Sequence, residues 1–139
     1  MTVYLADTSI WSWAYGRRSP EIADKLGARL DADELATCNP VVVEFLHRAR
    51  TGTELEQLLE QAVMRLRWLT TGGRAWSRAL AVQRSLAQVG NRRHRRPALD
   101  YVIAATAELA DAVLWAFDRD MEVICEHTGQ PCELESAET

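Results

Sequence analysis

Residues 2–11 read TVYLADTSIW, and this stretch decides how the rest of the chain folds. Residues 3–6 form a short run of apolar and β-favouring side chains, long enough for one buried strand. The run ends at Asp7, and either Thr8 or Ser9 can cap the helix that the next apolar positions predict. Asp7 therefore falls where a buried strand gives way to a helix, which in open α/β sheets is the edge where ligands bind. Asp7 either satisfies backbone N–H groups at this turn or holds a metal ion, and both interpretations stay open at this point.

The composition is that of an ordinary globular domain, with 139 residues of which 47% are hydrophobic and 26% charged. We therefore expect a single domain over residues 1–139. The net charge of −4 argues against broad attraction to nucleic acid but leaves room for a local basic patch. Apolar runs stay well short of the ~20 residues of a membrane span, and Asp7 interrupts the apolar stretch that a signal peptide would need. We expect a cytoplasmic protein with no membrane segment.

Strand-like and helix-like segments alternate along the chain, which indicates an α/β fold with a parallel sheet. Besides residues 3–6, short apolar segments predict strands at residues 35–38, 111–117 and 132–134.

Helix starts are predicted by a capping residue followed by proline, as at Ser19-Pro20 and at Asn39-Pro40. Pro97 predicts another start, which puts Asp100 in the first turn of a helix. Apolar residues at helical spacing predict two consecutive helices over residues 55–66 and 76–89, arranged as a helical hairpin.

Four acids share a position in this pattern. Asp7 and Asp118 end apolar strands, whereas Glu44 and Asp100 lie near the starts of helices that follow proline. Strand ends and the following helix starts lie at the same edge of a parallel sheet, so the four can converge in one cleft. Clustered carboxylates repel each other and need a cation, and all-oxygen ligands favour Mg²⁺ or Mn²⁺. Singly, each acid has a simpler explanation, such as a surface position for Glu44 or the helix dipole for Asp100.

A basic run, RRHRR at residues 92–96, lies directly before the helix of Asp100. It is either a solvated loop or a loop that holds nucleic-acid phosphates near the acids, where guanidinium contacts are strong. The dipeptide Arg17-Arg18 is a weaker candidate for the same role. The candidates in the basic run are Arg92, Arg93, Arg95 and Arg96.

The strings YLADTSIW, NPVVVEFL, RRPALDYVIAATAE and VLWAFDRDMEVI, in this order and spacing, resemble the PIN-domain ribonucleases, and specifically the VapC toxins of prokaryotic toxin–antitoxin pairs. The resemblance covers essentially the whole chain and is most specific in ADTS and LDYVIAATAE. It implies a three-layer α/β sandwich, with a parallel sheet of four to five strands flanked by helices. It also implies an endoribonuclease that depends on Mg²⁺ or Mn²⁺, forms a homodimer and is silenced by a cognate VapB-type antitoxin.

The resemblance assigns roles to the four acids. Asp7, Glu44, Asp100 and Asp118 match the acidic quartet of the family. Asp7, Asp100 and Asp118 would hold the metal, with Glu44 as a ligand, a water-mediated ligand or the base that orients water. A metal-activated water would then attack the scissile phosphate of RNA and leave 5′-phosphate and 3′-hydroxyl ends.

The resemblance also assigns supporting residues. Ser9, or alternatively Thr8, matches the hydroxyl that supports the site, and Asp120 matches a further acid close to it. The chain departs from the family at Met121, where an aromatic residue is common, and this change affects packing more than the ligands.

Two other classes of enzyme and signalling domain fit these residues poorly. Haloacid-type phosphatases need a second Asp two residues after the first, where Ser9 stands, and receiver domains need a lysine opposite the acid pocket. The only lysine, Lys25, falls in a predicted outer helix. A catalytically silent PIN-fold module that binds metal or RNA without cleavage stays open, since it would present the same acids.

Overall fold

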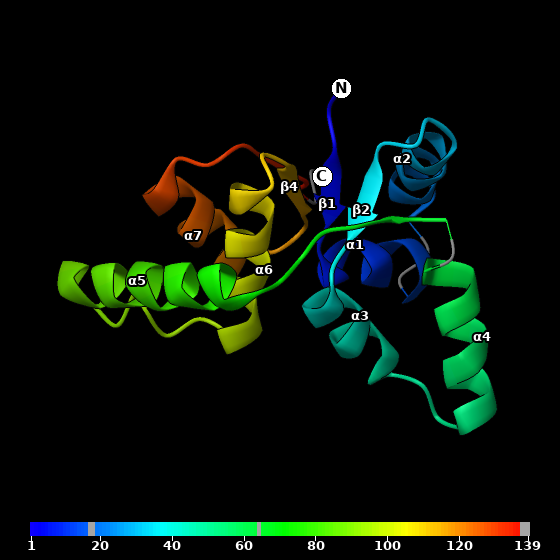
Figure 1. Cartoon of the computed structure of the whole chain (residues 1–139), viewed down its shortest axis with the longest axis horizontal. Coiled ribbons are helices and arrows are strands. Elements are labelled where there is room, and N and C mark those ends of the chain that lie inside the picture. Colours follow the sequence, from blue (N-terminus) through cyan, green and yellow to red (C-terminus); the bar gives the residue numbers. More distant parts are fainter. Residues whose placement is uncertain (17–18, 64, 137–139) are drawn as a thin grey trace.

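The computed structural model of the chain describes residues 1–16, 19–63 and 65–136, and its centre is a parallel sheet of five strands (Figure 1). The strand order is β3-β2-β1-β4-β5, so the first strand of the chain is the central one. Tyr4 pairs with Leu35 on one side and with Val113 on the other. The strands are β1 (Tyr4–Ala6), β2 (Leu35–Thr37), β3 (Arg67–Trp68), β4 (Val113–Ala116) and β5 (Cys132–Leu134).

Helices cover both faces of this sheet, as the resemblance implied. Figure 1 shows α5, α6 and α7 grouped on one side of the strands and α2 and α4 on the other. The prediction of a three-layer α/β sandwich is therefore confirmed. The helices are α1 (Thr8–Trp11), continued by the π-helical turn η1 (Ser12–Gly16), α2 (Pro20–Asp31), α3 (Asn39–Leu46), α4 (Gly52–Val63), α5 (Gly73–Val89), α6 (Ala98–Leu109) and α7 (Arg119–Thr128).

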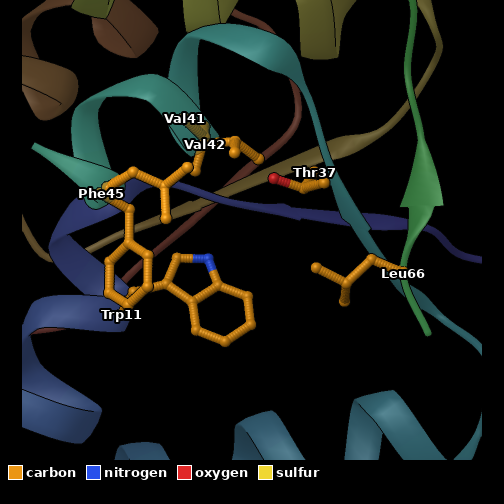
Figure 2. Close-up of a pocket in the computed structure, with 7 residues that line it drawn as sticks. Trp11, Thr37, Val41, Val42, Phe45 and Leu66 are labelled. Atoms are coloured by element: carbon orange, nitrogen blue, oxygen red, sulfur yellow. The ribbon is translucent and has the colours of Figure 1, made fainter. Parts of the chain in front are cut away.

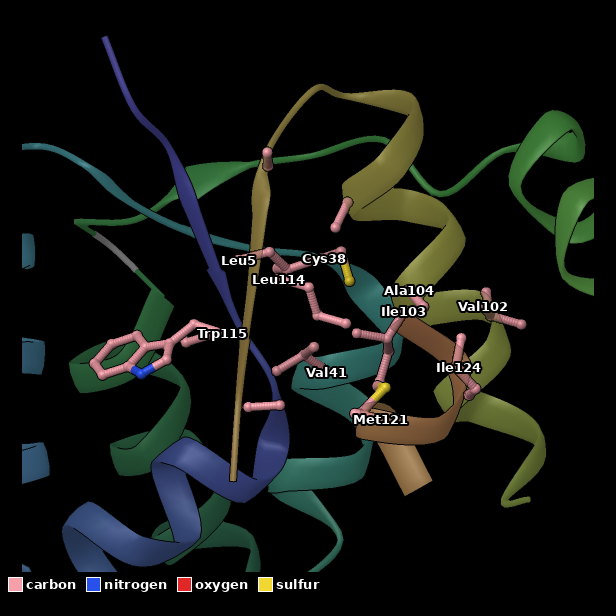
Figure 3. Close-up of a cluster of buried hydrophobic side chains, with 14 of the residues drawn as sticks. Leu5, Cys38, Val41, Val102, Ile103, Ala104, Leu114, Trp115, Met121 and Ile124 are labelled. Atoms are coloured by element: carbon pink, nitrogen blue, oxygen red, sulfur yellow. The ribbon is translucent and has the colours of Figure 1, made fainter. Parts of the chain in front are cut away.

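Alternate residues of the central strands pack against opposite layers of helices. Leu114 and Trp115 of β4 are both fully buried, and Figure 3 shows Leu114 on the side of α6 and Trp115 on the other. Every residue of α6 from Asp100 to Ala107 is buried, because small residues such as Ala104 allow close packing. Dense packing on several sides fixes α6, and with it the position of Asp100.

The helix starts that follow proline are largely those predicted, with one correction. The Ser19 hydroxyl accepts a hydrogen bond from the Ile22 N–H at 3.4 Å and caps α2. Asn39 does not cap α3, because it is already the first residue of that helix. Cys38 stands at the cap position and makes no side-chain cap bond.

The predicted helical hairpin is wrong. α4 ends at Val63, and residues 67–68 join the sheet as the edge strand β3 beside β2. The Leu69 N–H donates to the Thr37 carbonyl at 2.9 Å and continues this pairing. α5 then crosses to the other layer and packs against α6. A two-residue strand contains no apolar run, so nothing in the apolar pattern indicates a strand between the two predicted helices.

An apolar pocket lies where α1, α3, β2 and β3 meet (Figure 2). The described residues that line it carry no charged side chain, so the acids singled out by the sequence lie elsewhere. The residues that line this pocket are Trp11, Thr37, Val41, Val42, Phe45, Leu46 and Leu66.

No helix in the described part of the chain is long and apolar enough to span a membrane.

Candidate active site at the carboxyl edge of the sheet

Asp7 follows β1 and is held by the start of the next helix. Its carboxylate caps α1, accepting from the Ser9 N–H at 3.3 Å, so neither Thr8 nor Ser9 is the cap that the sequence suggested. The Ser9 hydroxyl donates to Asp7 Oδ2 at 2.7 Å and accepts from the Phe117 N–H at 2.9 Å. Ser9 therefore ties the ends of β1 and β4 together at the site. Thr8 Oγ1 is buried without a hydrogen-bond partner among the described residues.

Asp118 and Asp120 enter the site from the start of α7. Asp118 caps this helix, with its Oδ1 accepting from the Asp120 N–H at 3.0 Å. One side-chain oxygen from each of Asp100, Asp118 and Asp120 lies within 4.8 Å of the others. The tightest acidic group in the described part of the chain is thus built from the start of α6 and the start of α7.

Asp7 and Glu44 lie close enough to this group for their charges to act on it. Asp7 is only 2% exposed, and Glu44 is half-buried on α3. Neither belongs to the tightest group, yet the charges of both act on Asp100. The fold therefore brings the four acids that the sequence singled out into one electrostatic neighbourhood, with Asp120 added to it.

The electrostatics of the site show how poorly it tolerates negative charge without a cation. Burial raises the pKa of Asp7 from 3.8 to about 6, against the lowering effect of its hydrogen bonds to Ser9. Burial also raises the pKa of Asp100, and the charges of Asp7, Asp118 and Glu44 raise it further. A hydrogen bond between the carboxyl groups of Asp100 and Asp118 acts in the same direction.

The donor set fits a hard divalent cation. Asp7 Oδ1 and Asp100 Oδ2 are buried and have no hydrogen-bond partner within the described ranges. Buried carboxylate oxygens without partners are costly unless a cation binds them. The oxygens available are of the kind that Mg²⁺ and Mn²⁺ prefer.

The basic run forms a tight loop over residues 90–96 beside these acids. Three successive residues, Gly90, Asn91 and Arg92, have positive φ, which turns the chain sharply ahead of α6. The Tyr101 hydroxyl donates to the His94 carbonyl at 2.6 Å and anchors the loop to α6. Of the four arginines, Arg92 and Arg95 are exposed and Arg93 is half-buried, whereas Arg96 is paired with Asp120. Arg17 and Arg18 lie outside the described residues.

The pairing of Arg96 with Asp120 is the feature of the site that sequence reasoning missed. Arg96 Nη1 lies 2.8 Å from Asp120 Oδ1. The two residues are 24 positions apart, which hides the contact in the sequence. Both residues nevertheless lie next to helix starts: Arg96 directly precedes Pro97 ahead of α6, and Asp120 lies in the first turn of α7. This shared position is the sequence signal that could have indicated the contact.

Two open hollows include a residue of the site or its sequence neighbours. One is lined by Pro40, Val43, Trp76 and Leu99, of which Val43 and Leu99 adjoin Glu44 and Asp100 in the sequence. The other is lined by Asp118, by polar residues of α7 and the C-terminal segment, and by apolar side chains.

Comparisons with known proteins agree with this architecture. Residues 4–126 match the PIN domain family. Ribonuclease VapC18 of Mycobacterium tuberculosis is 36% identical over 132 residues, which is 94% of this chain and 93% of that protein. Ribonuclease VapC21 of the same organism is 31% identical over 133 residues, covering 95% of this chain and 93% of that protein.

The fold similarity extends to solved structures. VapBC-1 from nontypeable Haemophilus influenzae has a chain that matches with a TM-score of 0.74 at 18% identity, covering 95% of this chain and 97% of that one. The parallel sheet with acids at its carboxyl edge defines the protein as an α/β domain with a ligand site at that edge. The family matches then identify which family of such domains it belongs to. The chain belongs to the PIN domain family and, within it, to the VapC ribonucleases.

Proposed function

We propose that this chain is a metal-dependent endoribonuclease that acts as the toxin of a toxin–antitoxin pair, with residues 1–139 working as one nuclease domain. The observation that carries the proposal is the pair of buried carboxylate oxygens, Asp7 Oδ1 and Asp100 Oδ2, that no described protein group satisfies. They stand at the sheet edge where an α/β fold binds its ligands. Mg²⁺ or Mn²⁺ is the proposed cofactor, because the donors are all oxygens.

Each acid has a proposed role. Asp7, Asp100 and Asp118 hold the cation, and Glu44, half-buried on α3 and close enough for its charge to act on Asp100, orients the attacking water or accepts its proton. When bound, such a cation activates water and stabilises the charge that develops on phosphate oxygens. Ser9 keeps the Asp7 carboxylate in place. Asp120 supports the site through its N–H bond to Asp118.

The proposed substrate is RNA, held in part by the exposed guanidinium groups of Arg92 and Arg95 and in part by Arg93 and Arg96 closer to the acids. The proposed partners are a cognate VapB-type antitoxin and a second copy of this chain. Solved structures with the same fold include VapBC complexes, which supports the antitoxin. The proposed place of action is the cytoplasm, which agrees with RNA as the substrate.

Incubation of the purified protein with a pool of labelled RNA tests this function. We expect cleavage with Mg²⁺ or Mn²⁺, no cleavage with EDTA, and products that carry 5′-phosphate and 3′-hydroxyl ends. Ends with a 2′,3′-cyclic phosphate would contradict attack by water. A protein that binds Mn²⁺ and RNA but cleaves no RNA would instead be a silent binding module.

A further inference from the structure

Asp120 differs from the other acids of the site because the protein itself supplies its counter-charge. Arg96 Nη1 contacts Asp120 Oδ1 at 2.8 Å, and the two side chains are only 23% and 32% exposed. No ion pair within 4.0 Å involves Asp7, Glu44, Asp100 or Asp118 in the described part of the chain. The Arg96 guanidinium therefore places a permanent positive charge beside Asp120, whereas the other four acids of the site have no such counter-charge among the described residues.

The position of the Arg96 guanidinium is well defined. Its Nε donates to the Arg93 carbonyl at 3.0 Å, in addition to the Nη1 contact with Asp120. The segment before Arg96 is anchored to α6 by the hydrogen bond from Tyr101 to His94. A guanidinium keeps its charge at any physiological pH, so the cation at this place is permanent.

The site carries more carboxylates than a single metal ion needs. Oxygens of Asp100, Asp118 and Asp120 lie within 4.8 Å of one another, a group that could hold one ion, and Asp7 is a further carboxylate whose charge acts on Asp100. In two-metal sites the ions are ~3.5–4 Å apart and share carboxylates of this kind. A second ion here would need the charge of Asp120, which Arg96 already neutralises.

We propose that Arg96 is a built-in counter-cation that limits the acidic site to one divalent metal ion, by occupying the place beside Asp120 that a second ion would take. The inference rests on the proposed function, which assigns the first ion to Asp7, Asp100 and Asp118. Arg96 acts here as a positioning residue, because it acts on the metal site through Asp120. The negative charge of Asp120 then stays compensated at every metal concentration.

The stoichiometry of Mn²⁺ binding, measured by electron paramagnetic resonance of free and bound Mn²⁺, tests the inference without relying on activity. We expect one bound Mn²⁺ per chain for the wild type and two for Arg96→Gln. Arg96→Lys retains the positive charge and should keep one. The double variant Arg96→Gln/Asp120→Asn removes the ligand of the second ion and should return to one.

The Kd of the double variant Arg96→Gln/Asp120→Asn provides an independent test, should Arg96→Gln alone not fold, because it removes both charges of the ion pair and leaves the net charge of the site unchanged. We expect one Mn²⁺ with a Kd within about twofold of the wild type, because this variant keeps Asp7, Asp100 and Asp118. A loss of tenfold or more would overturn the inference. Two ions in the wild type, or one ion in a folded Arg96→Gln, would overturn it and leave the proposed function intact. A wild type that binds no Mn²⁺ would overturn both.

Discussion

The Ser9 hydroxyl donates to Asp7 Oδ2 at 2.7 Å, and the same hydroxyl accepts from the Phe117 N–H at the end of the neighbouring strand. One small side chain thus fixes the carboxylate that follows β1 relative to the end of β4, from which Asp118 projects. Thr8, the adjacent hydroxyl, is buried as well but makes no such bond within the described residues. Ser9 therefore bridges the ends of β1 and β4, and Thr8 does not.

Ser9→Ala should lower the free energy of unfolding by about 1–2 kcal/mol, because it leaves the Phe117 N–H without its partner and removes one of the two hydrogen bonds that Asp7 Oδ2 accepts. Thr8→Val should change stability by less than about 0.5 kcal/mol, because a hydroxyl without a partner is replaced by a methyl group of similar shape. Urea denaturation of both variants measures the difference. Equal losses in the two would contradict the bridging role of Ser9.

The raised pKa of Asp7 predicts how pH and metal act on stability. The pKa is about 6 in the folded protein against an ordinary 3.8, so the folded state without metal holds this proton more tightly than the unfolded chain. The resulting stabilisation is complete below the unfolded value and is lost as pH rises through about 6. A bound divalent cation offsets that loss by pairing with the carboxylate.

Thermal unfolding in EDTA and in Mg²⁺, from about pH 5 to about pH 8, measures this linkage. We expect the rise in Tm caused by Mg²⁺ to grow with pH. The variant Asp7→Asn, which has no proton to lose at this position, should show a flatter dependence in EDTA. A Mg²⁺ effect that is the same at every pH would mean that the buried carboxylates do not bind the ion.

The exposed arginines of the loop before α6 should contribute to RNA affinity by neutralising phosphates. Arg92→Gln combined with Arg95→Gln should weaken binding of single-stranded RNA and reduce the slope of log K against log salt by about 0.7 for each phosphate that is no longer neutralised. Fluorescence anisotropy in EDTA measures binding without cleavage. Arg65→Gln combined with Arg67→Gln is the matched control, because it also removes two positive charges and both arginines pair with acids, Asp31 and Asp33, at the β3 edge of the sheet. A slope that changes as much in the control would assign the effect to net charge alone.

The proposed homodimer has a candidate surface in the apolar hollow beside Glu44 and Asp100. Val43 is 64% exposed and Trp76 is 54% exposed, and both line this hollow. Trp76→Glu should convert a dimer to the 15.7 kDa monomer in light scattering after size exclusion. Trp68→Glu, which alters an exposed tryptophan on the edge strand β3, should leave the dimer intact. Dissociation by Trp68→Glu alone would place the interface at that edge.

Much of the fold was predictable because short-range signals agree with the topology. The apolar runs at β1 and β4 end at acids, and Pro20 and Pro97 begin helices where expected. The strand β3 was not predictable in the same way. Arg67 and Trp68 pair with β2 only because the chain passes beside it, and their side chains carry no strand pattern.

The acids of the site could be predicted from the sequence, but the hydrogen bonds and ion pair that hold them could not. Parallel topology alone places Asp7, Asp100 and Asp118 at one edge. Which hydroxyl supports Asp7, and which arginine meets Asp120, depends on side-chain geometry between segments far apart in the sequence. Ser9 and Arg96 could therefore be named as candidates, whereas their partners required the structure.

The most direct test of the account is RNA cleavage by Asp100→Asn compared with Asp111→Asn. Asn at position 100 keeps the shape of the protonated carboxyl group that the metal-free fold favours, so this variant should fold. Asp111 is exposed and has a φ of 54°, a conformation that Asn tolerates well, which makes Asp111→Asn a matched control. The account predicts that Asp100→Asn loses Mn²⁺ affinity and that its cleavage rate falls by on the order of 10²–10³, whereas Asp111→Asn matches the wild type. Cleavage at the wild-type rate by a folded Asp100→Asn would contradict a nuclease site built on these acids.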